Sequence, residues 1–436
     1  MDHPFSHGFL LILLFSSITF TIHACDLTER SALKSFASAL SSLALNWTAS
    51  VDCCQREGIT CNQNGWIIQL RLPSKGLTGG TFPSSLGNIK LLSHLNLSHN
   101  LLSGSLEAGM FLSLSRLEIL DLSYNLFSGE IPLSLSSSYI QMVDFSSNIF
   151  NGTIPSSFLQ HAWNLSRSLP ADIYNAQALQ EISLSTNGLV GPISENVGKL
   201  SKLKLMRLHY NNLQGHLHPS LMNCTNLVEI NLGFNFFSGN ISVLDFSNLT
   251  QLSKLDCISN NLTGTLPISL YSCKSLKALR LATNDFEGQI QPEILQLKNL
   301  TFLSLSRNRL TSVTGAMKIL TGFKSEEMPD GDITVDSGLQ NLCVFSLYSC
   351  HMTGHIPAWI SKLGKQEVLD LSFNRLTGTI PGWLGTLPHL FFLLLNDNLI
   401  SGEFPMELCR LQALVSQKAA NETGHCSLEL PVYLTR

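Results

Sequence analysis

Residues 369–385 read LDLSFNRLTGTIPGWLG, and variants of this phrase recur along the chain. Residues 120–132 read LDLSYNLFSGEIP, and residues 255–267 read LDCISNNLTGTLP. The shared template is L-x-x-L-x-L-x-x-N-x-L-x-G-x-I-P. Self-similarity at a fixed period is the sequence signature of a solenoid, in which each repeat stacks only on its neighbours. The template therefore predicts a solenoid.

The template occurs thirteen times, and ten of the twelve intervals between copies are 23 to 25 residues long. Each L-x-L pair predicts a short strand with buried leucines and outward x residues, paired in parallel with the strand of the next copy. The amide at the Asn position has donors and an acceptor for backbone groups in the turns of successive coils. The residues at this position are Lys75, Asn100, Asn125, Asn148, Asn187, Asn211, Asn235, Asn260, Asn284, Asn308, Cys350, Asn374 and Asn398.

Seven copies end with the proline of the G-x-I-P tail. Proline at this point suppresses a helix on the convex side of the coil and favours extended backbone. The tail is typical of plant-type leucine-rich repeats, so residues 25–436 resemble plant extracellular leucine-rich-repeat receptors. The resemblance implies an α/β fold, a right-handed leucine-rich-repeat solenoid over residues 66–405 with repeats of about 24 residues. It should be irregular at residues 156–178 and 311–341.

Residues 46–61, NWTASVDCCQREGITC, resemble the N-terminal cap of the same family, W…CC-x-W-x-G-x-x-C. The resemblance implies a cap over residues 25–65 with two disulfides, Cys25–Cys53 and Cys54–Cys61. Arg56 stands where the family has a second tryptophan. We therefore expect the packing of the cap to differ at this position.

The other cysteines have different expected roles. Cys350 takes the Asn position of its repeat as a small buried polar residue. Cys409 and Cys426 could form a bridge that holds the last residues over the final coil. Three cysteines inside repeats are expected to be buried free thiols, namely Cys224, Cys257 and Cys273.

The N-terminus predicts export. Residues 9–22 form an apolar run, and Ala24 suits a signal-peptidase cut before Cys25, so residues 1–24 are interpreted as a signal peptide. A short membrane anchor is the alternative, although the run is shorter than the roughly 20 residues of a bilayer-spanning helix. Ten Asn-x-Ser/Thr sequons support glycosylation of an exported protein, at Asn46, Asn96, Asn151, Asn164, Asn223, Asn240, Asn248, Asn261, Asn299 and Asn421.

Composition and motifs exclude several functional classes. The formal net charge is −4 and only 13% of the residues are charged, which argues against a basic surface for nucleic acid or anionic membranes. No hydrolase, zinc-protease, nucleotide-loop or kinase motif occurs, so we expect no enzyme, no cofactor and no metal site. His216 and His218 are interpreted as a surface pair rather than metal ligands.

Two intervals between copies are long, with 39 residues from Asn148 to Asn187 and 42 from Asn308 to Cys350. The first interval contains the tail of a repeat that lacks its own strand and Asn. This indicates that part of a repeat is missing there. In the second, residues 324–338 read KSEEMPDGDITVDSG. These acids lack the spacing of a calcium loop, which favours a solvated insertion over metal binding.

The outward residues between the strand leucines form a lane along the concave face, where a ligand is expected. Adjacent coils are about 4.8 Å apart, so Asp256 should neutralise Arg280. Arg207 has no acid beside it in this lane and is predicted, with Lys204, to be the better anion site. A plain solvated surface is the alternative for each residue. The predicted ligand contacts are Arg207, Lys204, Asp256, Arg280 and Asp370.

The repeat stops after Asn398. Residues 378–398, 407–424 and 428–433 resemble the plant receptors for tyrosine-sulfated peptides, the glycopeptide and phytosulfokine receptors. The resemblance implies that residues 406–436 are the truncated start of an island domain, a non-repeat insertion that helps to bind the peptide. In that family the island precedes more repeats, a membrane helix and often a kinase.

The resemblance implies the extracellular ligand-recognition domain of a plant cell-surface receptor-like protein. Its partners would be a secreted, sulfated peptide in growth or defence signalling and a leucine-rich-repeat co-receptor kinase. The chain as written would be secreted to the apoplast, whereas a longer parent with a membrane helix would lie at the plasma membrane, facing outward. Two alternatives stay open: a soluble wall-protein inhibitor of the polygalacturonase-inhibitor kind, and a non-functional truncated product.

Overall fold

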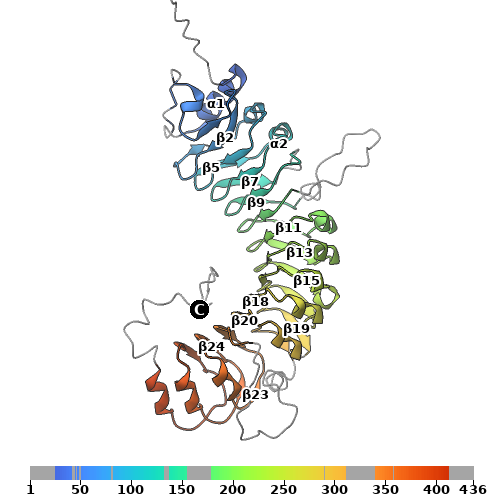
Figure 1. Ribbon diagram of the computed structural model, residues 1–436, viewed down its shortest axis with the longest axis vertical. Helices are drawn as coiled ribbons and strands as arrows, with labels where there is room; N and C mark the ends of the chain where they lie inside the picture. The colour runs from blue at the N-terminus through green and yellow to red at the C-terminus, as the bar shows by residue number, and fades with distance from the viewer. Residues whose placement is uncertain are drawn as a thin grey trace, which may run out of the picture.

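The coils stack into a curved solenoid with the N-terminal cap at one end (Figure 1). The predicted signal peptide, most of the two irregular stretches and the end of the predicted island segment lie outside the described residues. The computed structural model describes residues 25–41, 45, 47–48, 51–79, 82–131, 137–154, 178–288, 290–310, 339–356 and 358–411.

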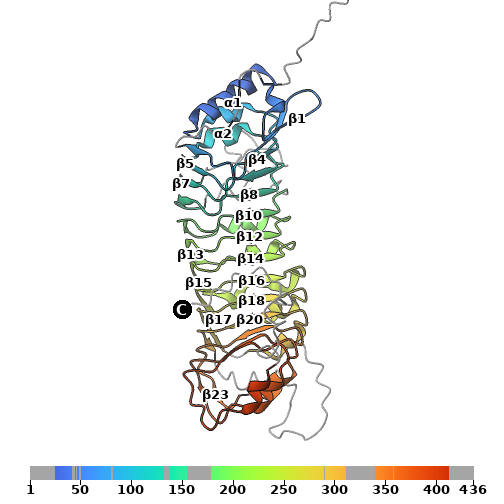
Figure 2. The same cartoon turned by 90° about the vertical axis from the view of Figure 1, so that its left-hand side faces the viewer.

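Each coil contributes one short strand to a sheet on the concave side (Figure 2). In the described residues the strands of this sheet are β1 (Ile59–Cys61), β2 (Ile67–Arg71), β4 (His94–Asn96), β6 (Ile119–Asp121), β8 (Met142–Asp144), β10 (Glu181–Ser183), β12 (Leu205–Arg207), β14 (Glu229–Asn231), β16 (Lys254–Asp256), β18 (Ala278–Arg280), β20 (Phe302–Ser304), β22 (Val344–Ser346), β24 (Val368–Asp370) and β26 (Phe392–Leu394). β1 and β2 are antiparallel, and the pairs from β2 onward are parallel. The central residue of the three-residue repeat strands is buried from β4 to β24, as the L-x-L pattern predicts, with Leu95 and Leu120 fully inaccessible.

Short strands on the flank of the solenoid follow the Asn position of each coil. They are β3 (Thr78–Gly79), β5 (Leu101–Ser105), β7 (Leu126–Glu130), β9 (Ile149–Asn151), β11 (Val190–Gly191), β13 (Asn212–His216), β15 (Phe236–Asn240), β17 (Asn261–Gly264), β19 (Asp285–Gly288), β21 (Arg309–Leu310), β23 (Thr353–Gly354) and β25 (Arg375–Leu376). At the first long interval a parallel bridge between Thr153 and Val190 connects the flank strands on either side, whereas no flank pairing joins β21 to β23 at the second among the described residues. The concave sheet continues across both, because β8 pairs with β10 and β20 with β22. The long intervals thus leave the concave lanes in register.

The convex side consists mostly of 3-10 turns, as the proline tail predicts. In the described part of the repeats, a short α-helix, α2 (Ala108–Ser113), occurs where Glu107 replaces the tail proline. The turns are η2 (Ser84–Asn88), η3 (Glu195–Lys199), η4 (Pro219–Asn223), η5 (Ile241–Val243), η6 (Phe246–Asn248), η7 (Ile268–Ser272), η8 (Pro292–Gln296), η9 (Ala358–Lys362), η10 (Gly382–Thr386) and η11 (Met406–Arg410).

Buried amides join each coil to the next. Asn125 Nδ2 donates to the carbonyl oxygens of Leu97 at 2.9 Å and Leu122 at 3.2 Å, while its Oδ1 accepts the N–H of Leu102 at 3.0 Å. One side chain therefore satisfies backbone groups of two coils, which confirms the predicted role of the recurring Asn. The same carbonyl contacts occur at Asn100, Asn148, Asn187, Asn211, Asn235, Asn260, Asn284, Asn308, Asn374 and Asn398.

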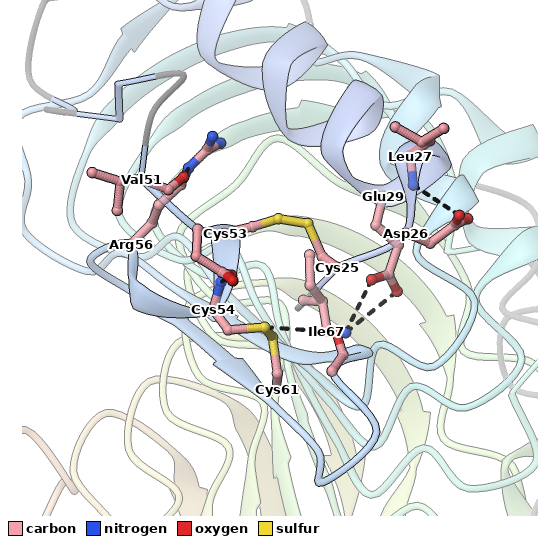
Figure 3. Close-up of a disulfide and its surroundings, with 12 residues drawn as sticks. Cys25, Asp26, Leu27, Glu29, Val51, Cys53, Cys54, Arg56, Cys61 and Ile67 are labelled. Atoms are coloured by element: carbon pink, nitrogen blue, oxygen red, sulfur yellow. Dashed lines mark hydrogen bonds between the residues drawn. A yellow bond between two sulfur atoms is a disulfide. The ribbon is translucent and has the colours of Figure 1, made fainter. Parts of the chain in front are cut away.

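The cap covers the first coil with helix α1 (Leu27–Ala39) and the turn η1 (Cys53–Gln55). α1 begins after Asp26, whose carboxylate accepts the N–H of Leu27 at 2.7 Å. Buried Glu29 accepts the N–H of Ile67 on β2 and so ties the helix to the sheet. Both predicted disulfides are present, Cys25–Cys53 and Cys54–Cys61 (Figure 3).

Arg56 fills the place of the missing tryptophan in the cap. Its guanidinium carbon lies 5.9 Å from the centre of the Trp47 ring. The guanidinium donates to the carbonyl oxygens of Val51 and Thr48, each at 3.3 Å. The side chain is therefore buried with hydrogen-bond partners at the position where the family pattern has a tryptophan.

The free cysteines mostly follow the expectation. Cys224, Cys257, Cys273 and Cys350 are buried free thiols. Cys409 is a free thiol exposed on the surface of turn η11. The predicted bridge from Cys409 to Cys426 is therefore wrong.

Candidate functional site

The predicted lane exists on the concave sheet. The parallel register aligns Arg207 with Asn231, Asn231 with Asp256, and Asp256 with Arg280 on consecutive strands β12 to β18. Asp370 lies in the same lane on β24, three strands beyond β18. The structure therefore brings Arg207, Asp256 and Arg280 into one neighbourhood and leaves Asp370 apart from them.

Asp256 and Arg280 form the predicted ion pair, with 2.7 Å between Oδ2 and Nη1. The pair is buried, with side-chain exposures of 2% for Asp256 and 7% for Arg280. Burial raises the pKa of Asp256 above its ordinary value, although the charge of Arg280 opposes this. The guanidinium carbon of Arg280 also lies 5.6 Å from the centre of the Phe302 ring. Arg280 is thus neutralised, as predicted.

The prediction that Arg207 lacks a carboxylate is wrong. Its Nε and Nη2 donate to Oε2 of Glu229 at 3.1 and 2.7 Å. Glu229 opens strand β14, so it lies on the next coil but in the neighbouring lane. Lys254 Nζ donates to the other carboxylate oxygen at 3.0 Å. The long Arg207 side chain reaches diagonally from its own lane to the neighbouring lane. A comparison of residues within a single lane does not detect this contact.

These five residues, Arg207, Glu229, Lys254, Asp256 and Arg280, are called the concave charge network below. Burial alone would raise the pKa of Glu229, but the hydrogen bonds from Arg207 and the charge of Lys254 outweigh it and lower this pKa. Burial alone would lower the pKa of Arg207, and its bonds to Glu229 raise it instead. The network therefore holds three cations and two carboxylates, with Arg207 and Glu229 ionised at neutral pH.

The other two predicted contacts have different surroundings. Lys204 is exposed just before β12 and, among the described residues, makes no ion pair. Asp370 Oδ1 accepts the N–H of Ser372 at 3.1 Å, and Ser346 Oγ lies 3.3 Å from Oδ2. Asp121 and Asp144 bond the N–H two residues later in the same way. Lane acids such as Asp370 thus support the turn after the strand, a structural role that the sequence analysis missed.

His209, which the sequence analysis did not single out, lies beside the network. Its Nδ1 is buried without a hydrogen-bond partner among the described residues. Burial, together with the charge of Lys254, lowers the pKa of His209 to about 4. The ring is therefore neutral over most of the acidic range.

A row of side chains follows the concave strands at positive φ, directly before the Asn position. Left-handed φ is uncommon outside glycine, yet every copy of the template adopts it here, for example at Tyr124 and Arg307. Several of these side chains stack between coils. His99 lies 4.2 Å from Tyr124, and Tyr210 lies 4.4 Å from Phe234, between ring centres. We call this row the edge row.

The predicted surface pair and glycan sites can be placed for most positions. His218 Nδ1 lies 2.9 Å from Ser220 Oγ, and no metal-binding cluster of three His, Cys, Asp or Glu side chains occurs in the described residues. Asn96 differs from the other sequons because it lies on the concave sheet and donates to Asp121 at 2.9 Å. Asn46, Asn164 and Asn421 lie outside the described residues. The exposed sequons are Asn151, Asn223, Asn240, Asn248, Asn261 and Asn299.

The comparisons with known proteins agree with this architecture. The Leucine rich repeat N-terminal domain model matches residues 26–62, and the Leucine Rich Repeat model matches residues 116–138 and 367–387. The crystal structure of a TDR receptor has a TM-score of 0.60 and 30% identity, covering 78% of this chain and 57% of that chain. Within the described residues, no helix has the length and apolar character needed to cross a bilayer.

Two relatives from Arabidopsis thaliana extend the match. Phytosulfokine receptor 1 is 36% identical over 223 residues, which cover 50% of this chain and 20% of that protein. Receptor-like protein 3 is 37% identical over 542 residues, which cover 98% of this chain and 71% of that protein. This alignment is longer than the 436-residue chain, so the relative has segments without a counterpart here. The chain belongs to the plant leucine-rich-repeat receptor-like proteins.

Proposed function

We propose that the protein is an extracellular ligand-recognition domain that binds a secreted, tyrosine-sulfated peptide on its concave sheet. The observation that carries this proposal is the concave charge network, which rigid parallel strands present on one face. Similarity to Phytosulfokine receptor 1 supports a peptide ligand. A leucine-rich-repeat co-receptor kinase is proposed as the second partner, and the role is binding rather than catalysis.

The spacing of the lanes suits an extended peptide. Neighbouring strands are about 4.8 Å apart, and an extended peptide rises about 3.3 Å per residue. A peptide that crosses the strands therefore meets a new set of lane side chains every one to two residues. Each charged side chain of the network already has a partner of opposite charge. A bound peptide must therefore share these side chains with their partners, which favours selectivity over raw affinity.

Arg207 and Lys254 are the cations of the network that are not fully buried, with side-chain exposures of 36% and 16%. Three cations share two carboxylates, and Glu229 uses both oxygens for Arg207 and Lys254. Glu181 and Asp144 on the preceding strands also act on Arg207, and Arg280 is neutralised by Asp256, so a sulfate here competes with Glu229 for Arg207 and Lys254. Its gain at Arg207 is limited because Glu229 already occupies two donors of that guanidinium.

Calorimetry on the secreted, glycosylated protein tests the proposal. The probes are synthetic peptide mixtures with a fixed central sulfotyrosine and, as the matched control, the same mixtures with tyrosine. Binding that depends on the sulfate is expected. Equal heats from both mixtures would count against a sulfated ligand. Inhibition of a polygalacturonase by the protein, without any sulfate-dependent binding, would favour the wall-protein inhibitor instead.

A further inference from the structure

The concave side and its edge row contain one arginine with an unusual setting. Arg207 and Arg280 each have a carboxylate partner, and Arg309 on the flank pairs with Asp285 at 2.8 Å. Arg307 and Arg71, which lies in the lane on β2, are both exposed and form no ion pair within the described part of the chain, but of these two only Arg307 lies against an aromatic ring there. We infer that Arg307, which is held on Tyr348 beside Phe373, binds the tetrahedral oxyanion that the ligand carries as an ester on an aromatic ring. This inference rests on the proposed function and replaces Arg207 as the anion-binding cation.

Tyr348 orients the guanidinium in two ways. The guanidinium carbon of Arg307 lies 4.9 Å from the centre of the Tyr348 ring, and Nη2 donates to the Tyr348 hydroxyl at 3.0 Å. The backbone N–H of Arg307 also donates to the carbonyl of Tyr348 at 2.8 Å. The side chain is therefore placed before a ligand arrives, which lowers the entropic cost of binding. The other guanidinium N–H groups form no hydrogen bond to a described residue, so they can donate hydrogen bonds to an oxyanion.

Phe373 supplies an aromatic surface next to this cation. Its ring centre lies 5.0 Å from that of Tyr348, on the side of the next coil, and the residue is 47% exposed. Arg307 and Phe373 both belong to the edge row and lie two coils apart, roughly 10 Å. An aryl ester that lies along the edge can place its charged end at Arg307 and its ring against Phe373.

A second arginine–tyrosine pair provides a comparison for the Arg307 site. The guanidinium carbon of Arg116 lies 5.2 Å from the Tyr139 ring, and Nη1 donates to the hydroxyl at 3.1 Å. This pair precedes strands β6 and β8, at the opposite end of the strands from the edge row. No other ring in the described residues contacts Tyr139. Arg116 therefore offers the same cation and tyrosine without the third ring, and serves as an internal control.

The chemistry of the site indicates an aryl sulfate or an aryl phosphate. Both combine a flat ring with a tetrahedral oxyanion that a guanidinium binds through parallel hydrogen bonds. For a secreted peptide we assign the sulfate ester. Free carboxylates of acidic peptides fit less well because they lack the ring that Phe373 receives.

Titration calorimetry with N-acetyl-sulfotyrosine amide tests the inference on the full glycosylated chain. Arg307→Gln should weaken binding about tenfold, as expected for the loss of a charge-assisted hydrogen bond. Arg309→Gln, two residues away, and Arg116→Gln should leave the affinity unchanged. Phe373→Ser should weaken sulfotyrosine about threefold without changing the affinity for inorganic sulfate. This second variant decides the test if Arg307→Gln does not fold.

The outcomes separate the inference from the proposed function. The site would be overturned if Arg307→Gln and Arg309→Gln lost affinity equally, or if Arg307→Gln lost none. The proposed function would still be upheld in that case if the wild type bound the peptide mixture in a sulfate-dependent way. Binding of N-acetyl-phosphotyrosine amide but not of the sulfate ester would overturn the assignment to sulfate. If neither the small probe nor the sulfated peptide mixture binds the wild-type chain, both the site and the proposed function fail.

Discussion

Replacement of Glu229 by glutamine tests the account of Arg207. The Glu229 carboxylate serves Arg207 at 2.7 Å and Lys254 at 3.0 Å, and its side chain is only 13% exposed. The substitution leaves two cations without a hydrogen-bonded carboxylate, of which Lys254 is 16% exposed, although Glu181 and Asp144 remain near Arg207 and Asp256 remains near Lys254. Exposed ion pairs contribute about 0.2–1 kcal/mol, whereas breaking a buried pair costs about 3–5 kcal/mol. For this intermediate burial, the free energy of unfolding should fall by about 2 kcal/mol.

The same variant should gain an anion site. Without Glu229, a sulfate ion can take the position of the carboxylate between Arg207 and Lys254. We therefore expect the thermal midpoint of Glu229→Gln to rise more than that of the wild type when sulfate replaces chloride at equal ionic strength. The comparison with the wild type removes the general stabilising effect of sulfate.

Glu287→Gln is the matched control, because Glu287 is exposed on the flank strand β19. It should change neither the unfolding free energy nor the response to sulfate. The reasoning is refuted if Glu229→Gln unfolds within about 0.5 kcal/mol of the wild type and responds to sulfate as Glu287→Gln does. Arg207 would then behave as a cation without a significant partner.

Three further predictions concern stability. Asp256→Asn leaves Arg280 buried without a carboxylate and should lower the unfolding free energy in urea by about 3 kcal/mol or more, whereas Asp121→Asn in the same lane should cost less than half of this. Asn125→Ala removes bonds to two coils and should cost about 3 kcal/mol, with faster amide exchange at Leu102; a loss below about 1 kcal/mol would contradict the amide ladder. The pKa of His209 is about 4 in the folded protein, against a reference value of 6.5. The contribution of the neutral ring to the free energy of unfolding is therefore complete above pH 6.5. It is lost as the pH falls from 6.5 to 4, by up to about 3 kcal/mol. His209→Gln should flatten this pH profile, and a profile unchanged from the wild type would disprove it.

Most of the fold could be predicted from the sequence because the leucine and Asn positions determine both burial and register. Even the long intervals leave the concave sheet continuous, since the strands on either side keep the L-x-L pattern. The place of α2 is compatible with Glu107 at the tail-proline position, but Ser194, His218 and Gln291 also replace this proline and are followed by 3-10 turns, so nothing in the repeat pattern singles out α2. The packing of Arg56 in the cap depends on the path of the backbone around Val51, which no repeat pattern encodes.

The candidate site was only partly predictable for a geometric reason. Pairing within one lane correctly matched Asp256 with Arg280, but long side chains also cross between lanes, as Arg207 does to reach Glu229. A count of acids in both lanes of the next coil would have found Glu229. Arg307 and Tyr348 are 41 residues apart across the irregular stretch, so their contact has no signal in the sequence spacing.

The central claim is that a sulfated peptide binds the concave sheet, and photo-crosslinking tests it most directly. The probe is the sulfotyrosine peptide mixture with a photoreactive residue next to the sulfotyrosine, and the adducts are mapped by mass spectrometry. The account predicts adducts on strands β12 to β24 and the adjoining edge row, which excess sulfated peptide suppresses and unsulfated peptide does not. Adducts confined to the convex 3-10 turns, or labelling that ignores the sulfate, would contradict it.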